Sequence, residues 1–154
     1  MLTDEERREI ESEIAGCENP ESASVEVLQA LQRRRGWVSD EAISDLAPLL
    51  GMSPDELDGV ATFYTFIFRR PVGRHVILVC DSVTCYIMGH ESIVTHLTRL
   101  LGVAMGETTA DSRFTLLPVS CIGLCDHAPA MMIDDDLHGD LDLAKVDEIL
   151  ARYP

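Results

Sequence analysis

The sequence lacks any apolar run long enough to cross a membrane. A helix that spans a bilayer needs ~20 consecutive, mostly apolar residues, and no segment of this chain approaches that. The N-terminus, MLTDEERREIESEI, is acidic and amphipathic, whereas a signal peptide is basic and then apolar. We therefore expect a globular protein of the cytoplasm, with no direct membrane insertion.

Basic residues are also scarce. Lysine and arginine number 12 against 27 aspartates and glutamates, and the formal net charge is −15. Such a charge repels nucleic acid and anionic membranes, because both carry dense negative charge. We expect no nucleic-acid partner. The acidic surface either serves solubility alone or suits a basic protein partner.

The nucleotide-binding motifs are missing as well. There is no G-x-G-x-x-G after a predicted strand and no G-x-x-x-x-G-K-[ST] loop, the backbone cradles that hold dinucleotides and phosphates. No Ser–His–Asp arrangement can be argued from the spacing either. We therefore expect this chain alone to bind neither NADH nor flavin, and we assign it no catalytic residue.

What the first 70 residues do contain is the apolar spacing of four short helices. Thr3 and Ser53 each precede a glutamate at the capping-box distance, Ser39 is a candidate N-cap, and Pro20 is expected to open the second helix. We expect a small helical bundle. Its aromatic residues have two open roles, as core filler or as a docking surface for a partner: Trp37, Phe63, Tyr64, Phe66 and Phe68.

In the second half of the chain, the spacing of apolar residues changes from that of helices to that of strands. Residues 75–80 and 114–120 are short β-branched or apolar runs typical of strands, and Pro118 marks the second as an edge or bulged strand. We expect one helix over about 86–101, two strands around the turn 134–136 and a last helix over 142–153. The order β-α-β-β-β-α predicts a thioredoxin-like plan. The fold class is thus α+β or α/β, with a helical bundle over 1–70 and a thioredoxin-like domain over 71–154.

Four of the five cysteines lie in two tight pairs, at 80 and 85 and at 121 and 125. Cys80 ends the first predicted strand, and Cys121 directly follows the second. Strands joined by a helical crossover run parallel and present their carboxyl ends at one edge of the sheet. We therefore expect the four thiols to meet there. In a reducing compartment such pairs indicate metal or redox chemistry more often than disulfides.

The spacing C-x4-C and C-x3-C leaves three interpretations open. Four thiolates suit an iron–sulfur cluster or tetrahedral zinc, and a thioredoxin-like plan also allows thiol–disulfide exchange. The spacers of four and three residues within the cysteine pairs are wide, and they favour a larger cofactor that contains two metals. Gly123 lets the backbone bend so that N–H groups can point at sulfur. Cys17, on the apolar face of the first helix, is interpreted as a small buried hydrophobe.

The segments RRGWVSDEAI, GVATFYTFIFRRPVGRHVI, CDSVTC and RFTLLPVSCIGLCDHAPAMMID, with the closing EILARYP, resemble the family of thioredoxin-like 2Fe–2S subunits of bacterial NADH-quinone oxidoreductase, the respiratory complex I. The resemblance covers roughly residues 28–154. It implies that Cys80, Cys85, Cys121 and Cys125 ligate one 2Fe–2S cluster. It also implies single-electron exchange with the FMN of a partner, the NADH-binding subunit of the same complex, at the cytoplasmic side of the inner membrane.

The resemblance leaves open which enzyme complex the chain belongs to. Relatives of the family serve in NAD-reducing hydrogenases and NAD-dependent formate dehydrogenases, and the sequence does not separate these complexes. From a different class, a structural zinc-binding module remains the alternative.

Overall fold

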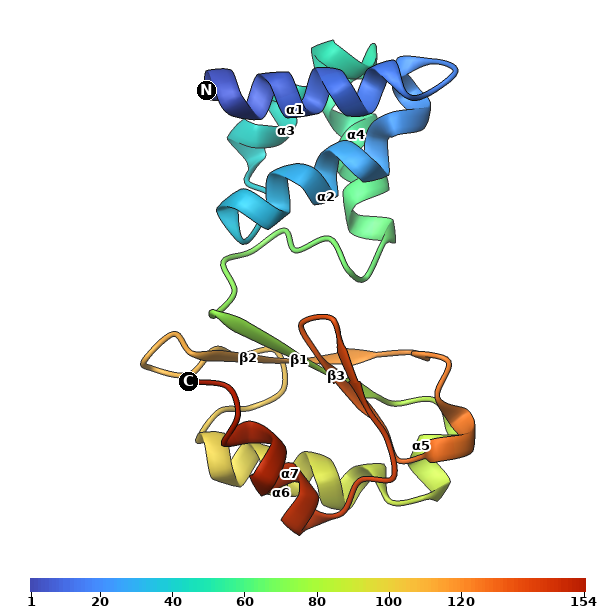
Figure 1. Cartoon of the computed structure of the whole chain (residues 1–154), viewed down its shortest axis with the longest axis vertical. Helices are drawn as coiled ribbons and strands as arrows, with labels where there is room; N and C mark the ends of the chain where they lie inside the picture. Colours follow the sequence, from blue (N-terminus) through green and yellow to red (C-terminus); the bar gives the residue numbers. More distant parts are fainter. The chain divides into compact units, whose positions relative to one another are not determined.

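The computed structural model describes all residues, 1–154, and the chain forms two compact units, Met1–Pro71 and Val72–Pro154 (Figure 1). Each unit has its own hydrophobic core. None of the helices combines the length and the apolar character that spanning a membrane requires.

The first unit is helical, as expected. Its elements are α1 (Asp4–Ala15), the 3-10 turn η1 (Pro20–Ala23), α2 (Ser24–Arg35), α3 (Asp40–Leu50) and α4 (Pro54–Phe63). Thr3 and Ser53 form complete capping boxes, and the Ser39 hydroxyl accepts from the backbone N–H of Ala42. One expectation was wrong in detail: Pro20 opens η1, and α2 begins only at Ser24.

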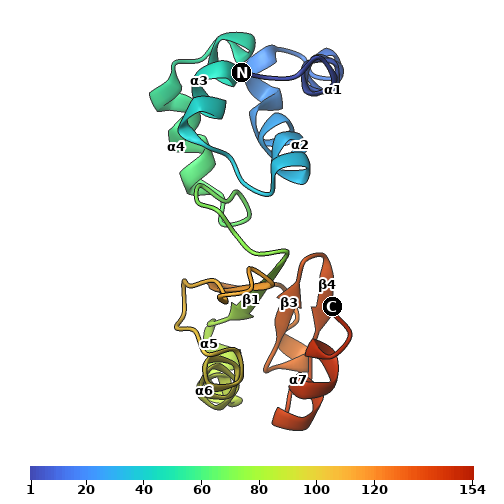
Figure 2. The ribbon, with the colours of Figure 1, turned by 90° about the vertical axis from the view of Figure 1, so that its left-hand side faces the viewer.

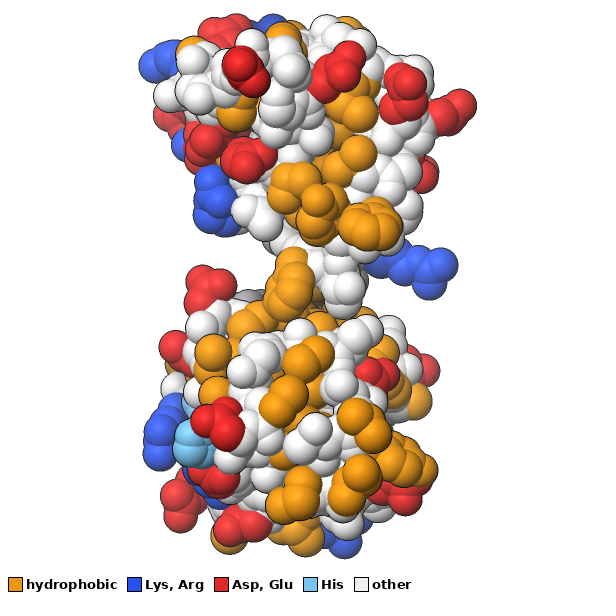
Figure 3. Space-filling model, turned by 90° about the vertical axis from the view of Figure 1, so that its right-hand side faces the viewer, with side chains coloured by type: hydrophobic (Ala, Val, Ile, Leu, Met, Phe, Trp, Pro, Cys, Tyr) orange, Lys and Arg blue, Asp and Glu red, His pale blue; other side chains and the backbone are white.

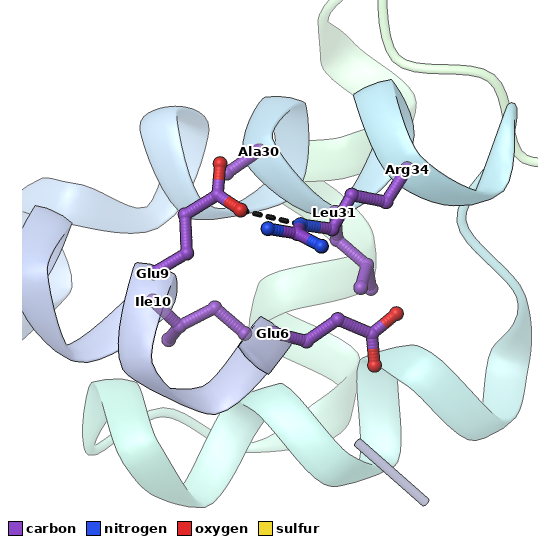
Figure 4. A pocket seen from close by; sticks show the side chains of 6 residues that line it. All are labelled: Glu6, Glu9, Ile10, Ala30, Leu31 and Arg34. Carbon is purple, nitrogen blue, oxygen red and sulfur yellow. Dashed lines mark hydrogen bonds and ion pairs between the residues drawn. The ribbon is translucent and has the colours of Figure 1, made fainter. Parts of the chain in front are cut away.

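The four helices enclose an aliphatic core of Leu, Ile, Val and Ala side chains. Cys17 packs against this core and is half-buried, but it lies beyond the end of α1 rather than on that helix. The groove between α1 and α2 is bridged at the surface by Arg34, whose Nε donates to Glu9 Oε2 at 2.5 Å (Figure 4). This groove is therefore occupied by the protein's own ion pair.

The aromatic residues at the end of α4 and just after it are not core filler. Phe63 is 80% exposed, and Tyr64 and Phe66 are 44% and 41% exposed. The buried residue of the segment is Ile67. Gln32 holds the backbone in place, because its amide donates to Phe66 O at 2.8 Å and accepts from Phe68 N at 2.6 Å. The core interpretation is therefore wrong for these three rings, and the docking interpretation stays a prediction.

The second unit is built on a four-stranded sheet in the order β2-β1-β3-β4 (Figures 1 and 2). The strands are β1 (His75–Cys80), β2 (Phe114–Val119), β3 (Met131–Ile133) and β4 (Asp136–His138). β1 pairs with β2 in parallel and with β3 in antiparallel, and β4 is antiparallel to β3. Pro118 is exposed on the edge strand β2, where its missing N–H costs the sheet nothing.

Helices α6 (His90–Leu101) and α7 (Leu143–Leu150) lie side by side against one face of this sheet (Figures 1 and 2). The predicted single helix over 86–101 is wrong. The chain instead forms α5 (Val83–Ile87) and then α6, because Gly89 has φ +116° and ends the helical path. Leu100, in the last turn of α6, is 50% exposed.

Candidate metal centre

Cys80 and Cys121 lie at the same edge of the sheet. Cys80 is the last residue of β1, and its register partner in the parallel strand β2 is Val119. Cys121 follows two residues later. The Cys80 thiol is buried and donates to the Ser120 carbonyl oxygen at 3.6 Å, so the end of β1 is tied to the loop that leaves β2.

Cys85 lies inside the first turn of α5 and is only 1% exposed. Burial, followed by the contact with the Cys80 thiol, raises the pKa of Cys85 to about 11. A position near a helix N-terminus normally favours a thiolate, but here burial outweighs that effect. Cys85 therefore does not resemble the activated thiol that thiol–disulfide exchange requires.

Cys121 and Cys125 form the exposed half of the site. Their Sγ atoms are 3.7 Å apart, far longer than a disulfide bond of about 2.05 Å, and all five cysteines of the chain are free. Gly123 has φ +79°, which lets its N–H turn back toward Cys121 Sγ at 3.4 Å. That N–H is the main reason why the pKa of Cys121 is lowered.

The two pairs meet. Cys121 interacts with the Cys80 side chain and with Ser82 as well as with Cys125. However, the structure contains no group of three or more cysteine, histidine, aspartate or glutamate side chains that is arranged to bind a single metal ion. The donor set is four free thiols in two pairs, with a backbone N–H aimed at one sulfur. It fits a 2Fe–2S cluster, in which each iron takes two thiolates.

A segment that sequence reasoning missed holds the second cysteine loop in place. The backbone N–H of Asp140 donates to His127 O at 2.5 Å, and the carboxylate of Asp140 pairs with His127 Nδ1 at 2.7 Å. This pairing raises the pKa of His127. Gly139 packs so closely that a Cβ there would lie 2.5 Å from His127 Cβ. The only signal in the sequence was a glycine–aspartate pair after a short strand.

Comparison with known proteins agrees with this site. The model of the thioredoxin-like 2Fe-2S ferredoxin family matches residues 10–154. The NADH-quinone oxidoreductase subunit designated E from Pseudomonas aeruginosa is 53% identical over 153 residues, which cover 99% of this chain and 92% of that protein. The Escherichia coli protein of the same name is 49% identical over 152 residues, with coverage of 99% and 92%.

Among solved structures, an NAD+-reducing NiFe hydrogenase in its air-oxidized state contains a similar chain. The TM-score is 0.69 at 30% identity over 82% of this chain. The matched part spans 23% of the hydrogenase chain, so the similar fold is there one part of a longer polypeptide. With the full-length relatives and the family model taken together, the chain belongs to the thioredoxin-like 2Fe-2S ferredoxins, within the family of this NADH-quinone oxidoreductase subunit.

Proposed function

We propose that this chain is the 2Fe–2S electron-transfer subunit of an NADH-quinone oxidoreductase. It exchanges single electrons with the FMN of a partner, the NADH-binding subunit, and the complex lies at the cytoplasmic side of the inner membrane. The observation that carries the proposal is that two cysteine pairs lie together at the carboxyl ends of β1 and β2. The full-length relatives of the chain are named as a subunit of NADH-quinone oxidoreductase.

The ligands in this proposal are Cys80, Cys85, Cys121 and Cys125. Cys80 and Cys85 offer thiols from the buried side, and Cys121 and Cys125 offer them from the surface. A bound 2Fe–2S cluster supplies reversible one-electron transfer. The protein supplies ligand geometry and the N–H of Gly123, which stabilises negative charge on Cys121. The surrounding acidic chain, with net charge −15, opposes added negative charge and favours a low reduction potential.

The oxidoreductase activity belongs to the assembled complex, and this chain is its electron carrier. The second candidate for the complex that contains this chain is an NAD-reducing hydrogenase, because a similar fold occurs within such an enzyme. The four ligands and the electron-carrier role are the same in both cases. Only the partner proteins differ, so isolating the complex distinguishes the two.

The test is the visible absorption and low-temperature EPR spectrum of the purified chain, before and after dithionite. We expect a reddish protein with about two irons per chain and an EPR signal only after reduction, as a 2Fe–2S centre requires. A colourless protein that carries one zinc ion would overturn the proposal and favour the structural zinc module.

A further inference from the structure

Helix α5 exposes a cluster of large apolar side chains, which we call the α5 patch. Val83 is 69% exposed, Tyr86 57%, Ile87 75% and Met88, the residue after the helix, 57%. Figure 3 views the molecule from the side that carries α5 in Figure 1, and hydrophobic side chains gather on that face of residues 72–154. All four residues lie within the segment 83–88, on either side of the buried Cys85.

The fold does not explain this patch. The only buried residue of α5 is Cys85, and none of the four patch residues belongs to the hydrophobic core of the unit. Scattered single apolar residues are normal on a surface, but contiguous ones mark interaction sites. The α5 patch therefore indicates a surface that another molecule covers.

The α5 patch borders the exposed sulfurs. Ser82, the N-cap residue just before α5, contacts the Cys121 side chain, and Cys85 lies close enough to Cys125 for the two side chains to interact electrostatically. A protein seated on the α5 patch would therefore also cover Cys121 and Cys125, the exposed half of the metal centre. Electron tunnelling weakens steeply with distance, so a redox partner must approach this same edge.

The rim of the patch is acidic. Asp81, Glu91 and Asp126 are exposed around it, and no lysine or arginine occurs in residues 75–98 or 114–144. A second copy of the chain would bring two acidic rims together, and like charges across an interface are costly. A partner with basic residues around an apolar centre would be attracted.

We propose that the α5 patch is the docking surface for the NADH- and flavin-binding partner protein, which meets it with an apolar surface rimmed by lysine and arginine. This inference rests on the function proposed above and adds to it the face that the partner occupies. In the hydrogenase, the similar fold belongs to a longer chain, which agrees with a module that works against a larger redox protein.

The test measures the affinity of the full-length, cluster-loaded chain for the purified NADH- and flavin-binding protein of its own complex. Ile87→Glu places a charge at the centre of the patch, and Ile87→Ser removes apolar area without adding charge. Leu100→Glu is the matched control, because Leu100 is 50% exposed on α6 and outside the patch. Burial of a charge at the centre of an interface should weaken binding at least about tenfold, whereas the control should bind like the wild type.

The EPR signal of each variant reports whether the metal centre survived. Weaker binding of both Ile87 variants with an unchanged EPR signal supports the inference. Wild-type affinity in both, or an equal loss in Leu100→Glu, overturns it. If Ile87→Glu loses the cluster, the result for Ile87→Ser decides. A wild-type chain that carries the cluster yet does not bind the NADH- and flavin-binding protein contradicts the proposed function instead, so the two failures are distinguishable.

Discussion

The four candidate ligands differ sharply in their surroundings. Cys80 and Cys85 are 2% and 1% exposed, whereas Cys121 and Cys125 are exposed. Burial raises the pKa of Cys85, and the Gly123 N–H lowers the pKa of Cys121. In the proposed centre, the buried pair would hold the cluster from the interior of the unit, and the surface pair would face the partner.

Cys121→Ser should abolish or strongly diminish the 2Fe–2S signal, because a hydroxyl is a poor substitute for the thiolate that iron prefers. Iron content and the visible spectrum of the purified variant measure the loss. Cys17→Ser is the matched control, since Cys17 packs against the helical core and should keep the full signal. A Cys121→Ser protein with full iron content and an intact spectrum would remove Cys121 from the ligand set.

The contact between helices α1 and α2 is stabilised by one buried carboxylate, that of Glu6. Glu6 is 6% exposed and completes the Thr3 capping box. Arg35, in the last turn of α2, donates to both carboxylate oxygens of Glu6 at 2.7 Å. The hydrogen bond from Arg35 is the main cause that lowers the pKa of Glu6 from 4.5 to about 2.

The stability of the helical unit should therefore depend on pH through Glu6. Its pKa is lower in the folded state, so its contribution of about 3 kcal/mol is fully present above pH 4.5 and is lost as the pH falls toward about 2. Glu6→Gln should remove about 2 kcal/mol at neutral pH and flatten this dependence. Urea unfolding followed by the fluorescence of the single tryptophan, Trp37, measures both effects.

Glu9→Gln is the comparison for that experiment. Glu9 pairs with Arg34 across the same two helices (Figure 4), but both side chains are more exposed than that of Glu6. Solvent screens such a pair, so its loss should matter much less. An equal loss of stability in both variants, or an unchanged pH profile in Glu6→Gln, would show that the buried pair is not the locking contact.

At the scale of the whole molecule, the chain consists of two units with separate cores, divided between Pro71 and Val72. All four candidate ligands lie in the second unit. We propose that residues 1–70 and 71–154 are distinct domains, a helical bundle and an iron–sulfur domain, and that the metal centre needs only the second.

Residues 71–154 expressed alone should therefore fold and show the same reduced-state EPR signal as the full chain. Circular dichroism and EPR of the fragment measure these two properties, and the full-length protein prepared in parallel is the reference. A fragment that stays unfolded, or that folds without taking up iron, would show that the helical unit contributes to the stability or assembly of the metal centre.

Local sequence signals predicted most elements of both units, and the order of these elements placed Cys80 and Cys121 at one edge of the sheet. Capping residues such as Thr3, Ser39 and Ser53 satisfy backbone groups within their own helix, so their effect is readable without tertiary structure. β1 and β2 are joined by a helical crossover and run parallel, so their carboxyl ends lie at the same edge of the sheet. The meeting of the four thiols therefore depends on topology rather than on packing detail.

Tertiary structure alone decided the rest. The break at Gly89 and the exposure of Leu100 depend on where the chain must turn and on what already covers each face. The contacts of Gly139 and Asp140 with the cysteine loop join segments that the sequence does not relate. The α5 patch is the clearest case, because the sequence does not show which apolar residues around Cys85 a unit buries, and the fold leaves Val83 and Ile87 largely exposed.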